Sequence, residues 1–244
     1  RFQPYVPDRK TSVLAVANDA RDLAARPARA KLVLDPLRQR GAVTYLAPAA
    51  VTKGLLEVEA SEFRRKIGEE FDLLVSMGGD DIDPALYGTA NRHSVNVNPS
   101  RDVEELKLVR DYLKQGKGFF TGICRGHQMA GIAAGCTLIQ DIQKELREAH
   151  PGNVDHTVRM DESAGELTRK LFAGQREMTT NSFHHQMVQG DGPHVRVTAV
   201  SGENAKITEV AEYFGGRGLG VQFHPEEMPS SALHARFYDI LYGE

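Results

Sequence analysis

The 244-residue sequence lacks several features that would place it in a specialised class of protein. Two cysteines are too few for a disulfide framework, which indicates a reducing compartment such as the cytoplasm. No apolar stretch approaches the ~20 residues that a membrane span needs. The net charge of −3 and the pI near 6.3 provide no field that would hold nucleic acid or an anionic membrane surface.

The sequence also shows no internal repeat, low-complexity tract or interdomain linker. Its length suits one large α/β domain with a buried core, so residues 1–244 are expected to form a single domain. The chain begins at Arg1 and not at methionine, which leaves open an earlier leader or tag.

The most informative segment is Thr121–Gln128, TGICRGHQ, where glycines stand two residues before and two residues after a cysteine. An apolar run precedes it and a small-residue helical run follows, a pattern typical of a sharp strand-to-helix turn. Such a turn strains the cysteine backbone and requires neighbours without side chains. The Cys124 thiol would lie at a helix N-terminus, which favours a negative charge. The pattern predicts a cysteine nucleophile elbow, with a buried structural cysteine as the alternative.

A second motif, QFHPE at residues 222–226, favours the catalytic interpretation. An apolar run at residues 219–223 predicts a strand leading into it. Residues two apart on an extended segment point to the same side, so His224 and Glu226 are expected to face one site. A cysteine nucleophile needs a base, and the base needs a group that orients its ring. Cys124, His224 and Glu226 are therefore predicted to form a catalytic triad.

Together, GICRGHQ and FHPE resemble the motifs of the class I glutamine amidotransferase superfamily. MGGDDIDPALYG at residues 77–88 is similar to the glycine loop of the gamma-glutamyl hydrolases, and NSFHHQ at residues 181–186 to a segment of the gamma-glutamyl-gamma-aminobutyrate hydrolases. The resemblance extends from about Ser12 to Tyr242, with the motifs in the family's order. It implies a flavodoxin-like α/β fold of the class I glutamine amidotransferase type. Its mainly parallel central sheet would be flanked by helices, with additional antiparallel strands in the C-terminal half.

Apolar runs and helical patterns that alternate along the chain predict the same α/β layout. The expected strands are residues 13–17, 43–46, 72–76, 118–123, 137–142, 154–160, 195–200, 207–214 and 219–223. The expected helices include residues 34–40, 57–67, 101–115, 125–134 and 231–241. Ligands in such folds bind beyond the carboxyl ends of the strands, and all four motifs fall there.

Thiolate attack on an amide creates an oxyanion that backbone N–H groups must stabilise. In elbow enzymes one donor is the N–H of the residue after the nucleophile, here Arg125. The second donor is expected from the glycine loop at residues 78–79, and the resemblance points to Gly79. An ordinary turn is the alternative for this loop.

Gln128 lies one helical turn after Cys124 and can face the same pocket. The resemblance implies that Gln128 helps to hold the glutamyl group, with an exposed helix residue as the alternative. It also implies that Phe183, His184 and His185 line the glutamyl pocket, partly through backbone atoms.

No cofactor and no metal are predicted. Asp80, Asp81 and Asp83 are carboxylates of the kind that hard cations bind, but turn hydrogen bonds before Pro84 explain them better. His184 and His185 lack the spacing of metal ligands, because adjacent side chains diverge and no third ligand is evident. The remaining residues of this kind are interpreted as surface, satisfied polar or small buried residues: His93, His150, His156, His194, His234 and Cys136.

The sequence thus predicts a cytoplasmic cysteine hydrolase that cleaves the γ-glutamyl amide bond of a small γ-glutamyl compound through a γ-glutamyl thioester. Two alternatives remain: a glutaminase subunit that supplies ammonia to a separate synthetase, and a catalytically silent binding protein on the same scaffold. The loop Thr89–Pro99 departs from the polyamine-pathway hydrolases, so the amine leaving group is left open, as is self-association.

Overall fold

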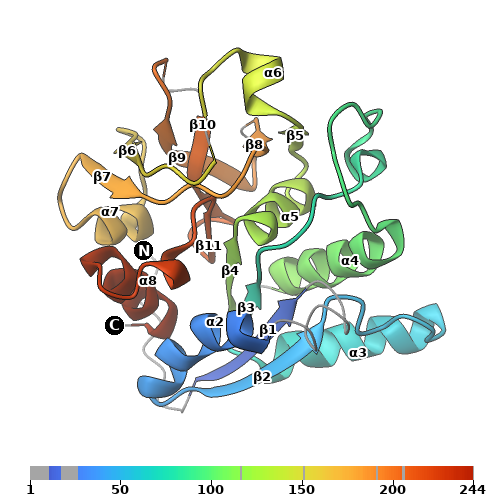
Figure 1. Cartoon of the computed structure of the whole chain (residues 1–244). Helices are drawn as coiled ribbons and strands as arrows, with labels where there is room; N and C mark the ends of the chain where they lie inside the picture. Colours follow the sequence, from blue (N-terminus) through green and yellow to red (C-terminus); the bar gives the residue numbers. More distant parts are fainter. Residues whose placement is uncertain are drawn as a thin grey trace.

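A nine-stranded mixed sheet runs through the residues that the computed structural model describes, which are 11–17, 27–115, 117–150, 152–190, 192–204 and 207–243 (Figure 1). The strand order is β2-β1-β3-β4-β11-β10-β9-β6-β7. The strands are β1 (Ser12–Ala17), β2 (Val43–Pro48), β3 (Leu73–Ser76), β4 (Phe119–Ile123), β6 (His156–Met160), β7 (Glu177–Thr180), β9 (Val195–Ser201), β10 (Ile207–Tyr213) and β11 (Gly218–Val221). A separate antiparallel pair joins β5 (Thr137–Ile139) to β8 (Met187–Gln189).

The sheet has a parallel half and an antiparallel half that meet at β11. Strands β2, β1, β3, β4 and β11 pair in parallel with their neighbours. Strands β10, β9, β6 and β7 continue the sheet in antiparallel pairs. The predicted α/β fold, with parallel strands first and antiparallel strands in the C-terminal half, is therefore confirmed.

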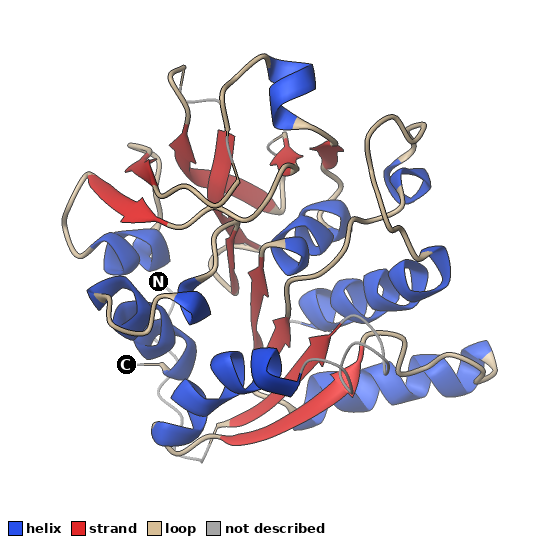
Figure 2. Ribbon diagram, viewed as in Figure 1, coloured by secondary structure: helices blue, strands red, loops and turns tan. Residues whose placement is uncertain are grey.

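Helices cover both faces of the sheet (Figure 2). The α-helices are α2 (Pro27–Gln39), α3 (Glu57–Glu70), α4 (Pro99–Gln115), α5 (Arg125–Ala133), α6 (Ile142–Leu146), α7 (Glu166–Phe172) and α8 (Ala232–Tyr242), and the 3-10 helices are η1 (Pro84–Tyr87) and η2 (Pro225–Glu227). Along β1, Leu14 and Val16 pack in the core with α3, α4 and α5, whereas Val13 and Ala15 pack in the core with α2 and α8. Because side chains alternate along a strand, one buried strand supplies both cores. No described helix has the length and the apolar character that a membrane span requires.

Two parts of the predicted layout differ in the structure. The strand expected at residues 137–142 ends at Ile139, because Asp141 accepts a hydrogen bond from the N–H of Lys144 at 2.9 Å and caps α6. Helices α6 and α7 and strands β7 and β8 were not predicted. These elements are three to seven residues long, and only two of the four residues of β7 are buried. Such short segments carry little periodic signal.

Candidate active site

Cys124 occupies a sharp turn between β4, which ends at Ile123, and α5, which begins at Arg125. Its backbone has φ 52° and ψ −106°, a conformation that residues with side chains rarely adopt. The N–H of Cys124 donates to the carbonyl of Val221 at 2.8 Å, which ties the turn to β11. The strained elbow predicted from the glycine spacing is therefore present.

The two glycines of the elbow allow helix α5 to pack directly on the sheet. A Cβ on Gly126 would lie 1.9 Å from the carbonyl oxygen of Ser76, at the end of β3. A Cβ on Gly122 would lie 2.4 Å from the carbonyl oxygen of Gly126. A side chain at either position would therefore force α5 away from the strands that carry the site.

His224 lies between Cys124 and Glu226. Its Nδ1 atom is 2.7 Å from Oε1 of Glu226, and its ring lies beside Cys124. A Cβ on Gly78 would lie 2.9 Å from Cε1 of His224 and 3.7 Å from Cβ of Cys124. The structure thus brings together the three side chains of the predicted triad, with the glycine loop against the point where the cysteine and histidine meet.

The segment that carries His224 and Glu226 is not extended, so this part of the prediction is wrong. Residues 225–227 form the 3-10 helix η2, and Pro225 supplies a preset φ at its first position. The turn folds the carboxylate of Glu226 back toward the ring two residues earlier. This turn explains why His224 and Glu226, which are only two residues apart, hydrogen-bond with each other.

Asn181 fixes the backbone on both sides of the histidine. Its Nδ2 donates to the carbonyl of His224 at 2.8 Å, and its Oδ1 accepts from the N–H of His224 at 2.8 Å. Phe183, which is 48% exposed, places its ring edge-on against the imidazole, with 5.6 Å between centroids. The segment at residues 181–186 therefore positions His224, a role for Asn181 that sequence reasoning missed although the motif contained it.

The electrostatic surroundings of His224 favour its protonated form. Burial opposes the charge, but attraction by Cys124 and Glu226, together with the hydrogen bond that Nδ1 donates to Glu226, holds the pKa of His224 well above its ordinary value. An imidazolium beside a thiol stabilises the thiolate, which is the nucleophilic form of cysteine. The arrangement can therefore supply a nucleophile and a proton donor together.

The side chain of Arg125 braces the elbow from inside the protein. It is 1% exposed and donates to Oδ1 of Asp102 at 2.7 Å and to Glu105. Glu105 also accepts from Oγ of Ser76 at 2.6 Å, and Asp102 accepts from the N–H of Asp83 at 3.0 Å. Two acids of α4 thus connect the elbow to the glycine loop.

These acids were missed because the helical spacing of the apolar residues at 103, 106, 109 and 113 carried the prediction of this helix. Val103 is 37% exposed, whereas Asp102 and Glu105 are 0% and 1% exposed. Their spacing of three residues on a predicted helix was the available signal, since it places them on one face.

The two predicted oxyanion donors lie beside the nucleophile. Arg125 is the first residue of α5, so its N–H has no acceptor within the helix. Gly79 directly follows Gly78, the glycine that contacts His224. Their roles as donors stay predictions.

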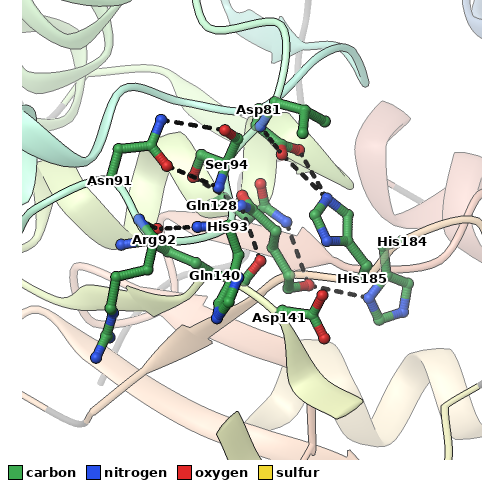
Figure 3. Close-up of polar contacts among 12 residues, drawn as sticks. Asp81, Asn91, Arg92, His93, Ser94, Gln128, Gln140, Asp141, His184 and His185 are labelled. Atoms are coloured by element: carbon green, nitrogen blue, oxygen red, sulfur yellow. Dashed lines mark hydrogen bonds and ion pairs between the residues drawn. The ribbon is translucent and has the colours of Figure 1, made fainter. Parts of the chain in front are cut away.

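The predicted substrate residues have different surroundings. Gln128 is buried one turn after Cys124, and its Nε2 lies 3.3 Å from both the carbonyl of Gln186 and Oε1 of Gln222. His185 is half-buried, and its hydrogen bond with Asp81 at 3.0 Å is the main cause that raises its pKa. His184 is buried, and its ring points away from that of His185 (Figure 3). The adjacent histidines therefore diverge, as predicted.

The loop between η1 and α4 is held by side chains from the C-terminal half (Figure 3). Oε1 of Gln140 accepts from the N–H groups of Arg92 and His93 at 2.8 and 3.0 Å. Nε2 of Gln186 donates to Oγ of Ser94 at 2.9 Å. The loop that was expected to recognise the leaving group is therefore fixed to the segments that follow β5 and precede β8.

Asp83 makes the turn hydrogen bond expected of the aspartates after the glycine loop, whereas Asp81 bonds to a residue 14 positions later. Oδ1 of Asp83 accepts from the N–H of Ala85 at 3.1 Å and caps η1, and Asp81 accepts from the N–H of Val95 at 2.8 Å. Cys136 is a buried residue, as predicted, with its thiol 3.4 Å from the carbonyl of Gly190.

The prediction that His184 lacks further ligand-type neighbours is wrong. Nε2 of His184 lies 3.0 Å from Nε2 of His150 and 3.8 Å from Oε2 of Glu209. His156 pairs with the same glutamate, its Nε2 2.8 Å from Oε1. These residues are far apart in the sequence and meet only because β10 lies below the segment at residues 181–186. Burial lowers the pKa of His184 to about 4, so its ring is neutral at pH 7.

The fold and this site define a class I glutamine amidotransferase-like protein, and comparisons with known proteins agree. Residues 40–226 match the Peptidase C26 family. The chain is 30% identical to NtpR of Enterococcus hirae over 176 residues, which are 67% of this chain and 70% of NtpR. It is 29% identical to the glutamine amidotransferase-like protein YvdE of Lactococcus lactis over 182 residues, 70% of this chain and 73% of YvdE.

A crystal structure of a glutamine amidotransferase from Thermotoga maritima superposes with a TM-score of 0.59 at 16% identity, covering 96% of this chain and 89% of the other. The chain belongs to the peptidase C26 family, the gamma-glutamyl hydrolase family within the class I glutamine amidotransferase-like superfamily.

Proposed function

We propose that the protein is a cysteine-dependent hydrolase that cleaves the γ-glutamyl amide bond of a small γ-glutamyl compound. The observation that carries this proposal is the position of His224, with Nδ1 2.7 Å from Glu226 and the ring beside Cys124. This arrangement supplies a nucleophile, a base and a group that orients the base. Membership of the peptidase C26 family supports a γ-glutamyl substrate.

In the proposed mechanism, the Cys124 thiolate attacks the γ-carbonyl carbon, so a C–S bond forms and the carbonyl oxygen becomes an oxyanion. The N–H groups of Arg125 and Gly79 stabilise that oxyanion. The C–N bond then breaks, and His224 protonates the leaving amine. His224 next takes a proton from water, which attacks the γ-glutamyl thioester, releases the γ-carboxylate and regenerates the thiolate.

The glutamyl group would lie between the elbow and the segment at residues 181–186. We assign Gln128, Phe183 and His185 to its pocket, because Gln128 follows Cys124 on α5 and Phe183 contacts His224. His184 would contribute by fixing the segment and not through its ring, which is buried.

A glutaminase subunit is the second candidate. The names of YvdE and of the Thermotoga maritima protein favour it, since both refer to glutamine amidotransferases. Such a subunit would pass ammonia to a separate synthetase and would need that partner for full activity.

Amide hydrolysis by the purified protein alone separates the two candidates. We expect it to release amine from substituted γ-glutamyl amides with a higher kcat/KM than it releases ammonia from glutamine. Glutamine leaves the amine pocket empty and gives up binding energy that remote contacts contribute to the chemical step. The Cys124→Ala variant, which lacks the proposed nucleophile, is the negative control. Activity that stays negligible on every γ-glutamyl amide until a second protein is added would favour the glutaminase subunit.

A further inference from the structure

A group of metal-ligating side chains lies outside the proposed catalytic triad. One ligand atom from each of His150, His184 and Glu209 lies within 4.8 Å of the ligand atoms of the other two. In a tetrahedral zinc site, bonds of about 2.0–2.1 Å place ligand atoms roughly 3.3 Å apart. The separations in the structure, 3.0 Å between the two nitrogens and 3.8 Å from His184 Nε2 to Glu209 Oε2, lie on either side of that value.

Glu209 has an oxygen that the protein does not satisfy. Its carboxylate is fully buried, and Oε1 accepts from Oγ of Ser201 at 2.7 Å and pairs with Nε2 of His156 at 2.8 Å. Oε2 has no hydrogen-bond partner among the described residues. A buried carboxylate oxygen of this kind is costly unless an ion or a donor occupies the space that it faces.

The hydrogen bonds of His184 prepare its ring for a metal. Nδ1 lies 3.0 Å from the carbonyl of Gln186, an acceptor that requires Nδ1 to carry the proton. The lone pair of the neutral ring is then on Nε2, which faces His150 and Glu209. A ligating histidine that donates its other N–H to a backbone carbonyl is the usual arrangement around metal ions.

Of the three residues, His150 borders open space. A cavity of about 320 Å³ is lined by residues that include His150, His156 and Ser201. Oγ of Ser182 lies 3.0 Å from Nε2 of His150, so a hydroxyl group or a water molecule from the cavity can complete four ligands.

We propose that His150, His184 and Glu209 bind a divalent transition-metal ion, with Zn²⁺ the ion that best suits two imidazoles and one carboxylate. The ion would connect the loop that carries His150 to strand β10 and to the segment at residues 181–186. Asn181 of that segment holds both sides of the His224 backbone. The metal is thus a structural support for the base of the proposed triad and does not touch the substrate.

Zinc binding to the Cys124→Ala variant of the full chain tests this site, because that background removes a thiol that could itself capture Zn²⁺. We expect one Zn²⁺ per chain by elemental analysis, and a melting temperature that rises on adding Zn²⁺. Co²⁺ should give visible bands typical of a tetrahedral site without thiolate ligands. Adding His150→Gln should weaken binding at least about 100-fold, because it removes a direct ligand.

His194→Gln in the same background is the control, since His194 is exposed and stacks on Phe214 with 4.6 Å between ring centroids. It should bind Zn²⁺ as the Cys124→Ala variant does. Glu209→Gln provides a second ligand substitution of nearly equal shape and should also abolish the stoichiometric ion. Failure of the Cys124→Ala variant to bind one ion, or equal binding by the His150→Gln and His194→Gln variants, would overturn the metal site and leave the proposed hydrolase unaffected.

Discussion

Two histidine–glutamate pairs of nearly equal geometry occur in this protein in different surroundings. The nitrogen–oxygen distance is 2.7 Å between His224 and Glu226 and 2.8 Å between His156 and Glu209. The ring of His224 lies beside Cys124, whereas Glu209 is fully buried beside further histidine rings. The comparison teaches that such a pair becomes a candidate base only where its ring also reaches a nucleophile.

The difference follows from the strands that carry the pairs. Cys124 and the His224–Glu226 turn follow the carboxyl ends of β4 and β11, which are adjacent parallel strands. Loops beyond the carboxyl ends of parallel strands are open to ligands. His156 and Glu209 lie within strands β6 and β10 of the antiparallel half, where Glu209 is fully buried.

Replacing His224 with alanine should have the largest effect on catalysis. We expect kcat/KM for a γ-glutamyl amide to fall by at least about 10³-fold. The residues of a triad act as a unit, so removing one of them loses most of the rate enhancement that the whole triad provides. The Cys124→Ala/His224→Ala double variant should be little worse than either single variant. Near-normal turnover by the His224→Ala variant, measured beside His194→Gln, would place the base elsewhere.

Replacing each of the two glutamates with glutamine tests the comparison directly. Glu226→Gln should lower kcat about 10²-fold with little change in KM, since Glu226 orients the ring and does not touch substrate. Glu209→Gln should act first on stability and lower the free energy of unfolding by about 2 kcal/mol, because it removes a buried charged partner. Steady-state kinetics and urea unfolding of both variants give the result. A larger loss of kcat in Glu209→Gln than in Glu226→Gln would reverse the assignment.

His127 represents a third environment, a buried neutral histidine whose ring hydrogen-bonds with Tyr213 at 2.9 Å. Burial lowers the pKa of His127 to about 3. Below about pH 6.5 the unfolded chain binds a proton here that the native state does not, so stability falls as the pH falls. His127→Gln should remove about 2 kcal/mol of the drop in unfolding free energy between about pH 7 and pH 5. Equal drops in both proteins, measured by urea unfolding, would contradict the buried neutral ring.

Gly78→Ala should have the smallest effect on activity. It should disturb the His224–Glu226 pair and leave the His156–Glu209 pair unchanged. The added Cβ would meet the end of the His224 ring at 2.9 Å, and a flexible side chain can move away. We expect kcat/KM to fall about tenfold while the melting temperature changes little, because a small displacement of a catalytic group slows the reaction. Gly152→Ala is the matched control, since a Cβ there has nothing within 4 Å. Equal activity of the two variants would show that the glycine loop does not contact the working ring.

The sequence was sufficient for the parts of the site that depend on local backbone constraints. The glycines around Cys124 predict a strained turn with close packing, because only residues without side chains fit there. The structure shows both the strained backbone of Cys124 and the close packing at its glycine neighbours. Hydrophobic runs likewise placed the parallel strands β1, β3, β4 and β11, because buried strands are apolar on both faces.

The remaining features depend on contacts between distant segments. Asp102 and Glu105 are buried charges that are stable only because Arg125 pairs with them, whereas the prediction of this helix rested on the spacing of its apolar residues. His184 and Glu209 come together only after the antiparallel strands assemble. The 3-10 turn at Pro225 is a local feature, but it was not predicted because the apolar strand pattern before it suggested that the extended segment continued.

The most direct test of the proposed function is the activity of two single-cysteine variants. Cys124 lies at the elbow beside His224, whereas Cys136 is a buried residue next to Gly190. With purified protein and a substituted γ-glutamyl amide, Cys124→Ala should abolish amine release, and Cys136→Ala should retain most of it. Acid-quenched wild-type protein should carry the glutamyl group on the peptide that contains Cys124. Comparable losses of activity in the two variants, or a glutamyl adduct at another residue, would contradict the assignment of Cys124 as the nucleophile.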